Sequence, residues 1–289
     1  MADTYDSGAL NRRLGHGADA RLLIVNCDDL GSSHAANVAI HRAMTAGVAT
    51  SASLMVPCPW AREAAAMCAG QDVGVHLTLT AEYPGYRWRS LTGAASLHDA
   101  DGFMPATMQA AVERAHPEDV RSECRAQIEQ ALAWGVDVTH LDSHMGVVQF
   151  DERLFTIYVD LAVEFALPLR MVGAGADARL GFEGRRRAAG RGVLFTDYLI
   201  DSWPRDVAQV FFDRIASLRP GVAEIFGHPV DDGPELRGYD PDQPELRARD
   251  ALCFTDPAAA RLIDEAGVIP ISYRPLRNLQ RGAPRGFEN

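Results

Sequence analysis

The sequence predicts an α/β protein that folds as a single-domain (β/α) barrel, either regular or irregular with fewer than eight strands. Short apolar runs alternate with amphipathic segments along the whole 289-residue chain. At least six strand-and-helix units follow one another, and no composition break or internal repeat divides them. A doubly wound open sheet is the alternative, but no GxGxxG follows the first strand, so nucleotide binding has no support.

The predicted strands are short apolar runs bounded by polar or turn-forming residues. In chain order they are residues 21–26, 49–56, 72–79, 136–144, 167–173, 222–228 and 269–273. The predicted helices between them are residues 34–46, 59–69, 116–135, 151–166, 204–221 and 256–268. Residues 116–135 give the clearest helix, because Val120, Cys124 and Ile128 lie on one stripe and Gly135 ends the pattern.

The remaining segments predict tails and loops around one domain. We expect a flexible N-terminal tail (residues 1–20), a barrel domain (21–276) and a C-terminal tail (277–289). Residues 173–194 are rich in Gly, Ala and Arg, and residues 229–250 are rich in Pro and Asp. Both lack a core-forming period and predict long loops, which either line a cleft or lie solvated on the surface.

The charges of these two loops suggest a lid. The first carries Arg179, Arg185, Arg186, Arg187 and Arg191, whereas the second carries Asp231, Asp232, Glu235, Asp240 and Asp242. Opposite charges on neighbouring loops attract weakly and would bias a lid towards closure. Two independently solvated loops are the alternative.

Composition excludes several classes of function. The net charge of −11 argues against a nucleic-acid partner, because phosphate binding needs a basic face. All 28 basic residues are arginine, which excludes a Schiff-base lysine, a pyridoxal enzyme of the usual kind and a P-loop. The chain has no apolar run of about 20 residues and no apolar signal-peptide centre, so we expect a cytoplasmic protein without a membrane partner.

The five cysteines show no metal-binding or disulfide spacing. Their number is odd and no CxxC is present, which predicts reduced thiols. Cys27, beside Asp28, is either the nucleophile of a cysteine hydrolase or a small apolar filler at a strand end. We favour the filler.

Polar residues that can bind a metal or transfer a proton recur at the predicted strand ends. Asp28 and Asp29 follow the first strand, where the simpler interpretation is a turn with a helix cap. The other residues of this set are His76 in "GVHLTL", His140, Asp142 and His144 in "THLDSH", and His228 after "AEIFG". Parallel strands bring their carboxyl ends to one face of a barrel, so these residues are expected to meet there.

Such a cluster explains the two adjacent aspartates. His140, Asp142 and His144 share parity and point the same way if the segment stays extended. One carboxylate and two imidazoles form a divalent-metal set with positions left open for water or substrate. One aspartate would bind the cation while the other stays free to act as a base.

At these residues the chain resembles the YdjC-like carbohydrate deacetylases. The matching elements are "NCDDLG", "GVHLTLT", "THLDSH" and "GHP", with "MVPCPWAREAA", "DADGFM", "LPLR" and "ISYRPL" in the expected order. The resemblance spans roughly residues 21 to 275. It implies a barrel-like α/β fold, a divalent metal, and removal of an acetyl group from an N-acetylated sugar.

The resemblance also implies roles for single residues. Asp29, His76 and His144 match the family's metal ligands, with Zn or Mg as the candidate ion. Asp28 matches the general base, His228 the acid that protonates the leaving amine, and Arg170 an arginine that orients the base or contacts substrate. The partner implied is an N-acetylated carbohydrate, and a homodimer is one oligomeric state compatible with the sequence.

Two residues depart from the family pattern. Gly146 stands where the family usually has a second histidine, and Leu30 replaces the usual phenylalanine. The glycine removes a polar group near the metal, which leaves the sugar unassigned. A metal-dependent amide or ester hydrolase of a non-sugar small molecule and a catalytically inactive sugar-binding relative therefore remain alternatives. The base Asp28 argues against the inactive relative, since binding alone does not need it.

Overall fold

The computed structural model describes residues 7–176 and 180–282, and its centre is a parallel sheet. Seven strands in this part of the chain form the sheet in the order β4-β3-β2-β1-β6-β5, with β7 beside β1. They are β1 (Arg21–Leu30), β2 (Ser51–Leu54), β3 (Val73–Leu77), β4 (Leu141–Ser143), β5 (Tyr198–Ile200), β6 (Gly221–Gly227) and β7 (Ile269–Pro270).

Single-residue bridges continue the sheet beyond β4 and curve it into an irregular barrel. Leu141 of β4 pairs in parallel with Leu169, and Leu169 pairs with Phe195, just ahead of β5. The predicted strand 167–173 is thus reduced to an isolated bridge. The predicted α/β barrel with fewer than eight strands is confirmed, and the doubly wound sheet is not observed.

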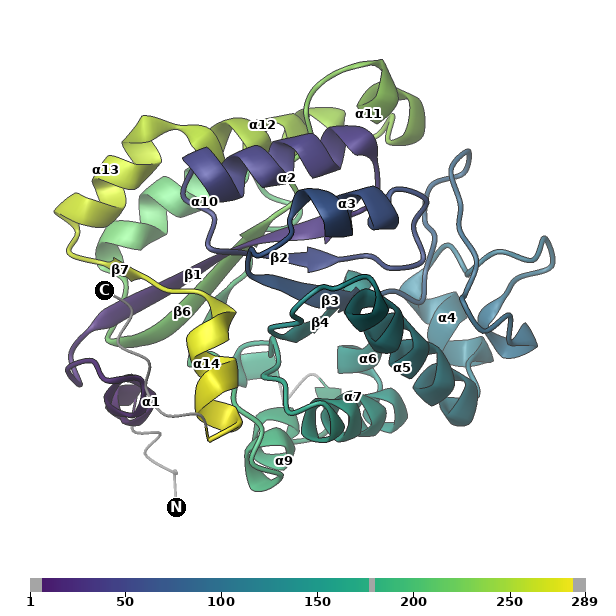
Figure 1. Ribbon diagram of the computed structural model, residues 1–289, viewed down its shortest axis with the longest axis horizontal. Helices are drawn as coiled ribbons and strands as arrows, with labels where there is room; N and C mark the ends of the chain where they lie inside the picture. Colours follow the sequence, from purple (N-terminus) through teal and green to yellow (C-terminus); the bar gives the residue numbers. More distant parts are fainter. Residues whose placement is uncertain (1–6, 177–179, 283–289) are drawn as a thin grey trace.

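Helices cover the outside of the sheet (Figure 1). They are α1 (Ser7–Leu14), α2 (His34–Ala46), α3 (Ala61–Met67), α4 (Met108–Arg114), α5 (Pro117–Ala133), α6 (Val147–Phe150), α7 (Glu152–Glu164), α9 (Gly184–Gly190), α10 (Val207–Arg214), α11 (Pro234–Tyr239), α12 (Pro244–Thr255), α13 (Pro257–Glu265) and α14 (Tyr273–Gln280). In Figure 1, α2, α10, α12 and α13 lie along one side, and α5, α7 and α9 along the other. None of the helices described is both long and apolar enough to cross a membrane.

The central strand β1 is almost completely buried, because it pairs with β2 and β6 along its length and with β7 near its start. Its register with β2 breaks once. Asn26 and Cys27 pair with Ser51 and Ala52, but Leu30 then pairs with Leu54. β1 therefore holds one residue more than β2 over this stretch, which is a β-bulge.

The bulge contains both aspartates. Asp29 has φ +62°, a left-handed conformation that Asp tolerates better than most residues. In a regular strand two neighbouring side chains point to opposite faces. Here both carboxylates line one cavity, because the extra residue and the left-handed turn break the alternation.

The tail predictions are wrong within the part of the chain that the structure describes. Helix α1 lies inside the predicted tail 1–20, and its Leu10 and Asn11 are buried, with the Asn11 amide donating to the Ala20 carbonyl (2.7 Å). Helix α14 crosses the predicted boundary at residue 276, and Arg277 is buried against the Val138 carbonyl (3.0 Å). Residues 1–6 and 283–289 lie outside the described residues.

The two predicted loops contain helices. Residues 184–190 form α9, and residues 229–250 contain α11 and most of α12. The missed signal is the repeated "PELR", since Pro at the first helical position followed by Glu is typical of a helix start. Periodicity failed because α11 spans only six residues.

The prediction for the fold concerns Gly74 of β3. A Cβ here would lie 2.5 Å from the ring of His140, which is buried and stacked on Tyr273. We expect Gly74→Ala to lower the free energy of unfolding by about 1–3 kcal/mol, because neither ring can retreat freely. Urea denaturation measures this. Gly238→Ala is the control, since its Cβ meets nothing within 4 Å, and equal stability of both variants would contradict the packing described.

Candidate active site

Asp29, His76 and His144 converge at the carboxyl ends of β1, β3 and β4. Asp29 Oδ1 lies 3.2 Å from His144 Nδ1 and 3.4 Å from His76 Nε2, and the two nitrogens are 3.3 Å apart. All three side chains are buried. The structure thus brings together the three predicted ligand residues, with one donor atom of each facing the other two.

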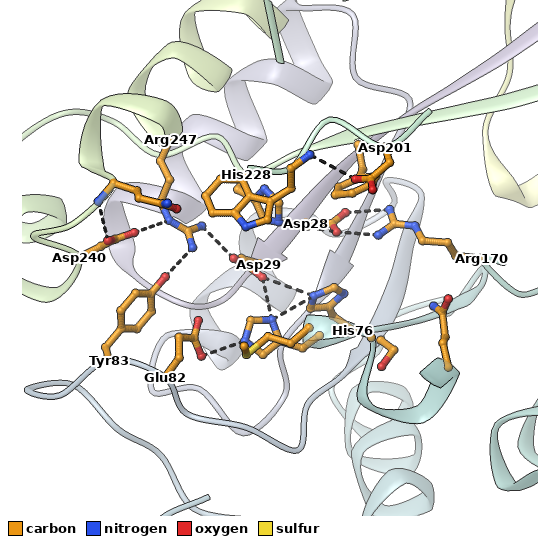
Figure 2. A pocket seen from close by; sticks show the side chains of 18 of the residues that line it. Asp28, Asp29, His76, Glu82, Tyr83, Arg170, Asp201, His228, Asp240 and Arg247 are labelled. Carbon is orange, nitrogen blue, oxygen red and sulfur yellow. Dashed lines mark hydrogen bonds and ion pairs between the residues drawn. The ribbon is translucent and has the colours of Figure 1, made fainter. Parts of the chain in front are cut away.

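Each of these side chains is held from behind by a charged partner. His76 Nδ1 lies 2.6 Å from Asp142 Oδ1, and His144 Nε2 lies 3.0 Å from Glu82 Oε2. The register pairs His76 directly with Asp142 across β3 and β4. Arg247 Nη1 donates to the second oxygen of Asp29 (2.8 Å), as Figure 2 shows.

The pKa values of the cluster follow from these partners. Burial alone lowers the pKa of an imidazole, but Asp142 and Asp29 raise the pKa of His76 to about 10. Burial acts likewise on His144, where Glu82 and Asp29 raise the pKa to about 9. Burial would raise the pKa of Asp29, yet His144 and His76 hold it well below its usual value. A cation would therefore bind in exchange for protons at neutral pH.

The donor set fits a divalent cation. Asp29 Oδ1 is buried and accepts no well-aligned hydrogen bond, although two imidazole nitrogens lie close to it. Two imidazoles and one carboxylate are a common donor set for Zn and related metals. A carboxylate behind each imidazole is the usual way in which a protein orients metal-binding histidines.

Asp28 faces the other way, towards Arg170 (Figure 2). The guanidinium donates to both Asp28 oxygens, at 2.6 and 2.8 Å, and the Asn26 amide donates to Oδ1 at 2.8 Å. Arg170 also lies 2.8 Å from Glu224 and 3.1 Å from Asp142. The buried Arg170 guanidinium thus contacts three carboxylates, and its two hydrogen bonds to Asp28 fix the orientation of that carboxylate.

His228 follows β6 and lies near Asp28, with Nε2 4.0 Å from Oδ2. Its ring is held by Trp203 at a centroid distance of 4.4 Å. Nδ1 is buried without a hydrogen bond and lies 4.0 Å from Asp250 Oδ2, which accepts the His228 backbone N–H (2.7 Å). Burial lowers the pKa of His228 to about 4 and raises that of Asp250 to about 7.

Sequence reasoning missed Glu82, Tyr83, Arg247 and Asp250. Arg247 Nη2 donates to Tyr83 OH (2.6 Å) and Nε to Asp240 (2.7 Å), so it joins three segments at the site. Arg247 and Asp250 lie on α12, within the segment predicted to be a loop. The helix-start signal before Arg247 could have placed them on one helix, but not beside Asp29, 218 positions away.

Two other residues considered in the sequence, His140 and Cys27, are buried and do not line the cavity. His140 stacks on Tyr273 with centroids 3.8 Å apart, and burial lowers its pKa to about 3. Cys27 is fully buried, and burial raises the pKa of its thiol well above the usual value. An inaccessible, protonated thiol is a poor nucleophile, which favours the filler.

The predicted attraction between two charged loops is not observed among the described residues, because their charges pair elsewhere. Arg185 is buried and donates to the carbonyls of Thr196 and Asp197, while Arg187 pairs with Glu152. Asp231 pairs with Arg42 on α2, and Asp232 pairs with Arg237. Arg179 lies outside the described residues.

The cluster opens into a cavity of about 620 Å³, a size typical of small-molecule sites. Polar groups from β1, β3 and β4 and the Phe226 ring of β6 form its floor, and the segments that follow β3, β4, β5, β6 and α11 form much of its walls. Three functional groups therefore face one cavity: the cluster that fits a cation, the Asp28 carboxylate and the His228 imidazole.

The fold and the site define a class: an α/β barrel with a buried His-Asp cluster at the carboxyl ends of its strands. Within this class, the chain belongs to the YdjC-like protein family, whose model matches residues 22–265. The predicted family is confirmed.

Two relatives match nearly the full chain. A protein of Thermus thermophilus named carbohydrate deacetylase is 35% identical over 275 residues, which is 93% of this chain and 98% of that protein. A carbohydrate deacetylase of Geobacillus stearothermophilus is 32% identical, covering 90% and 99%. A crystal structure from Enterococcus faecalis, provisionally described as a cellobiose-phosphate cleavage protein, has a TM-score of 0.78 at 24% identity, covering 89% and 99%, and shows the fold alone.

The prediction for this part of the structure concerns His140 and pH. Its folded pKa of about 3 lies below the unfolded value of about 6.5, so its stabilising effect is present above pH 6.5 and is lost as the pH falls towards 3. His140→Phe keeps a ring against Tyr273 and removes the titration. We expect the fall in unfolding free energy between pH 6 and 4 to become shallower, by at most about 1.4 kcal/mol per pH unit. Exposed His116→Phe is the control; an unchanged slope for His140→Phe would contradict a neutral buried imidazole.

Proposed function

We propose that this protein is a divalent-metal-dependent hydrolase that removes the acetyl group from an N-acetylated sugar or oligosaccharide. One observation carries the proposal: the two neighbouring aspartates have different partners. Asp29 faces two imidazoles, whereas Asp28 forms a bidentate ion pair with Arg170. A ligand and a separate base at one site are what metal-assisted hydrolysis requires. The carbohydrate deacetylases among its relatives support the sugar and the acetyl group.

Asp29, His76 and His144 are the residues that would hold the cation, with Zn or Mg as the candidate. A bound divalent ion lowers the pKa of water and polarises the acetyl carbonyl. Two imidazole nitrogens favour Zn over Mg, which prefers oxygen. Asp142 and Glu82 fix the orientation of the two rings from behind.

Asp28 accepts the proton of the attacking water. Arg170 holds the carboxylate in one orientation through two hydrogen bonds, and Asn26 adds a third. These donors hold the carboxylate at one place beside the cavity, as a general base requires. Arg170 is therefore a positioning residue that acts through Asp28.

His228 donates a proton to the departing nitrogen. An amine leaves readily only when it is protonated, so an acid must stand near the scissile bond. His228 lines the cavity, and Asp250 lies on the Nδ1 side of its ring, 4.0 Å away. Trp203 limits the rotation of the imidazole and leaves Nε2 as the atom nearer Asp28.

The experiment that tests this function measures acetate release from N-acetylated mono- and disaccharides, with and without a chelator. We expect release that a chelator abolishes and an added divalent ion restores. A panel of non-sugar N-acetyl and O-acetyl compounds tests the alternative small-molecule hydrolase. Release from these compounds alone would overturn the assignment to sugars.

The first prediction from this function is that Asp28→Asn loses turnover. The amide keeps the size of the side chain but cannot accept the proton, and general-base catalysis contributes about 10²–10⁴-fold. We expect kcat to fall by about that factor while cation binding and the overall fold are kept, although loss of the Arg170 ion pair lowers the melting temperature. Asp264→Asn, on exposed surface, is the control. Activity within a few-fold of wild type would place the base elsewhere.

A second prediction concerns Glu82, which lies behind His144 and is partly exposed. Glu82→Gln removes the negative charge and leaves only a neutral amide oxygen to accept the hydrogen bond that orients the ring. We expect cation affinity to fall by about 10–100-fold, measured by competition with a chelating dye. Glu118→Gln, whose side chain is 86% exposed, should leave the affinity unchanged. Equal affinities for wild type and Glu82→Gln would rule out this supporting role.

A further inference from the structure

The walls of the cavity carry acidic groups that the proposed reaction does not use. Beyond Asp28, Asp29 and Glu82, the described residues lining it include Asp201, Asp240 and Asp242. Asp201 and Asp242 are exposed, and Asp201 accepts a hydrogen bond only locally, from the Trp203 N–H (3.3 Å). Among the described contacts no ion pair engages Asp201 or Asp242, so these two carboxylates repel an anionic ligand placed beside them.

The guanidinium groups that line the cavity are already engaged. Arg170 forms ion pairs with Asp28, Asp142 and Glu224. Arg247 donates hydrogen bonds to Asp29, Asp240 and Tyr83. Both side chains are almost fully buried, and no other arginine lies among the described lining residues. Within that set, therefore, no arginine is free to bind a phosphate or a carboxylate.

The segment after His144 supplies an apolar wall. Met145 and Phe150 both line the cavity, and they are 43% and 41% exposed. Met145 has φ +51°, a left-handed conformation that is costly for this residue and turns the chain directly after His144. Exposed apolar side chains on a strained segment beside a site suggest a contact surface for a ligand.

Gly146 makes room for this wall. A Cβ at Gly146 would lie 2.1 Å from the Phe150 ring, so the ring occupies the space that a side chain at position 146 would need. Gly146 also has φ +71°, which glycine adopts without strain. The Phe150 ring therefore packs over Gly146 and presents an aromatic surface to the cavity, close in sequence to His144.

We propose that the substrate is an uncharged N-acetylated glycoside without phosphate or carboxylate groups, and that its portion beyond the acetylated ring lies against Met145 and Phe150. This inference rests on the proposed deacetylase function and adds the substrate class. The acidic walls reject anionic sugars, while the apolar wall binds the C–H face of a second sugar ring or another apolar aglycone. The cavity thus favours a substrate larger than a monosaccharide.

The test compares kcat/KM for N-acetylglucosamine, N,N′-diacetylchitobiose and N,N′-diacetylchitobiose 6-phosphate. We expect the uncharged disaccharide to react best, and its phosphate to react about tenfold or more slowly at low salt. High salt should narrow this gap, because screening weakens the repulsion. Equal or faster reaction of the phosphate would overturn the inference.

Two sets of variants test the apolar wall and the acidic wall independently. Phe150→Ala should lower kcat/KM for the disaccharide by about tenfold and leave the monosaccharide unchanged. Phe212→Ala is the control, because Phe212 is 40% exposed and lies outside the cavity. The double variant Asp201→Asn/Asp242→Asn should improve reaction of the phosphate only, and exposed Asp213→Asn should not. An equal loss for both sugars in Phe150→Ala would contradict the apolar wall.

Binding distinguishes failure of this inference from failure of the proposed function. Calorimetric titration of Asp28→Asn with the same three sugars measures recognition without turnover. Preferential binding of the uncharged disaccharide with no acetate release from wild type would overturn the deacetylase function and support the cavity assignment. Acetate release with no preference among the three sugars would support the deacetylase function and overturn the cavity assignment.

Discussion

The bulge in β1 is the constraint on which the rest of the site depends. A regular strand would turn one of the two neighbouring aspartates away from the cavity. The extra residue in β1, with Asp29 in a left-handed conformation, instead directs Asp28 towards Arg170 and Asp29 towards His76 and His144. Strain of this kind persists only where the surroundings hold it in place. Here Arg247 fixes Asp29 through its second oxygen.

The site is also a charge network that the barrel must bury. Arg170 forms ion pairs with Asp28, Asp142 and Glu224, which come from three different strands. Breaking such a group on one side leaves buried charge without a partner, which costs about 3–5 kcal/mol. Tyr273 of the C-terminal helix donates to Glu224, so even the end of the barrel domain supports the catalytic floor. Stability and function are therefore coupled at the same residues.

Much of this arrangement could be predicted from the sequence, because parallel strands bring their carboxyl ends together. That rule alone places Asp29, His76, His144 and His228 on one face. The bulge could not be foreseen, since it depends on the register between β1 and β2. The contact of Arg247 with Asp29 could not be foreseen either, because α12 lies in a Pro- and Asp-rich segment that shows no helical spacing of apolar residues. The shared parity of His140, Asp142 and His144 is also a poor guide, because β4 spans only three residues and both histidines lie outside it. His140 contacts Tyr273 instead.

The central claim is that Asp29, His76 and His144 form one cation site beside an independent base. Anomalous diffraction from crystals of the protein loaded with Zn tests it most directly. The account predicts one strong peak in contact with Asp29 Oδ1, His76 Nε2 and His144 Nδ1, and the same peak in Asp28→Asn. A peak bound by Asp28, or no peak at this cluster at saturating metal, would contradict it.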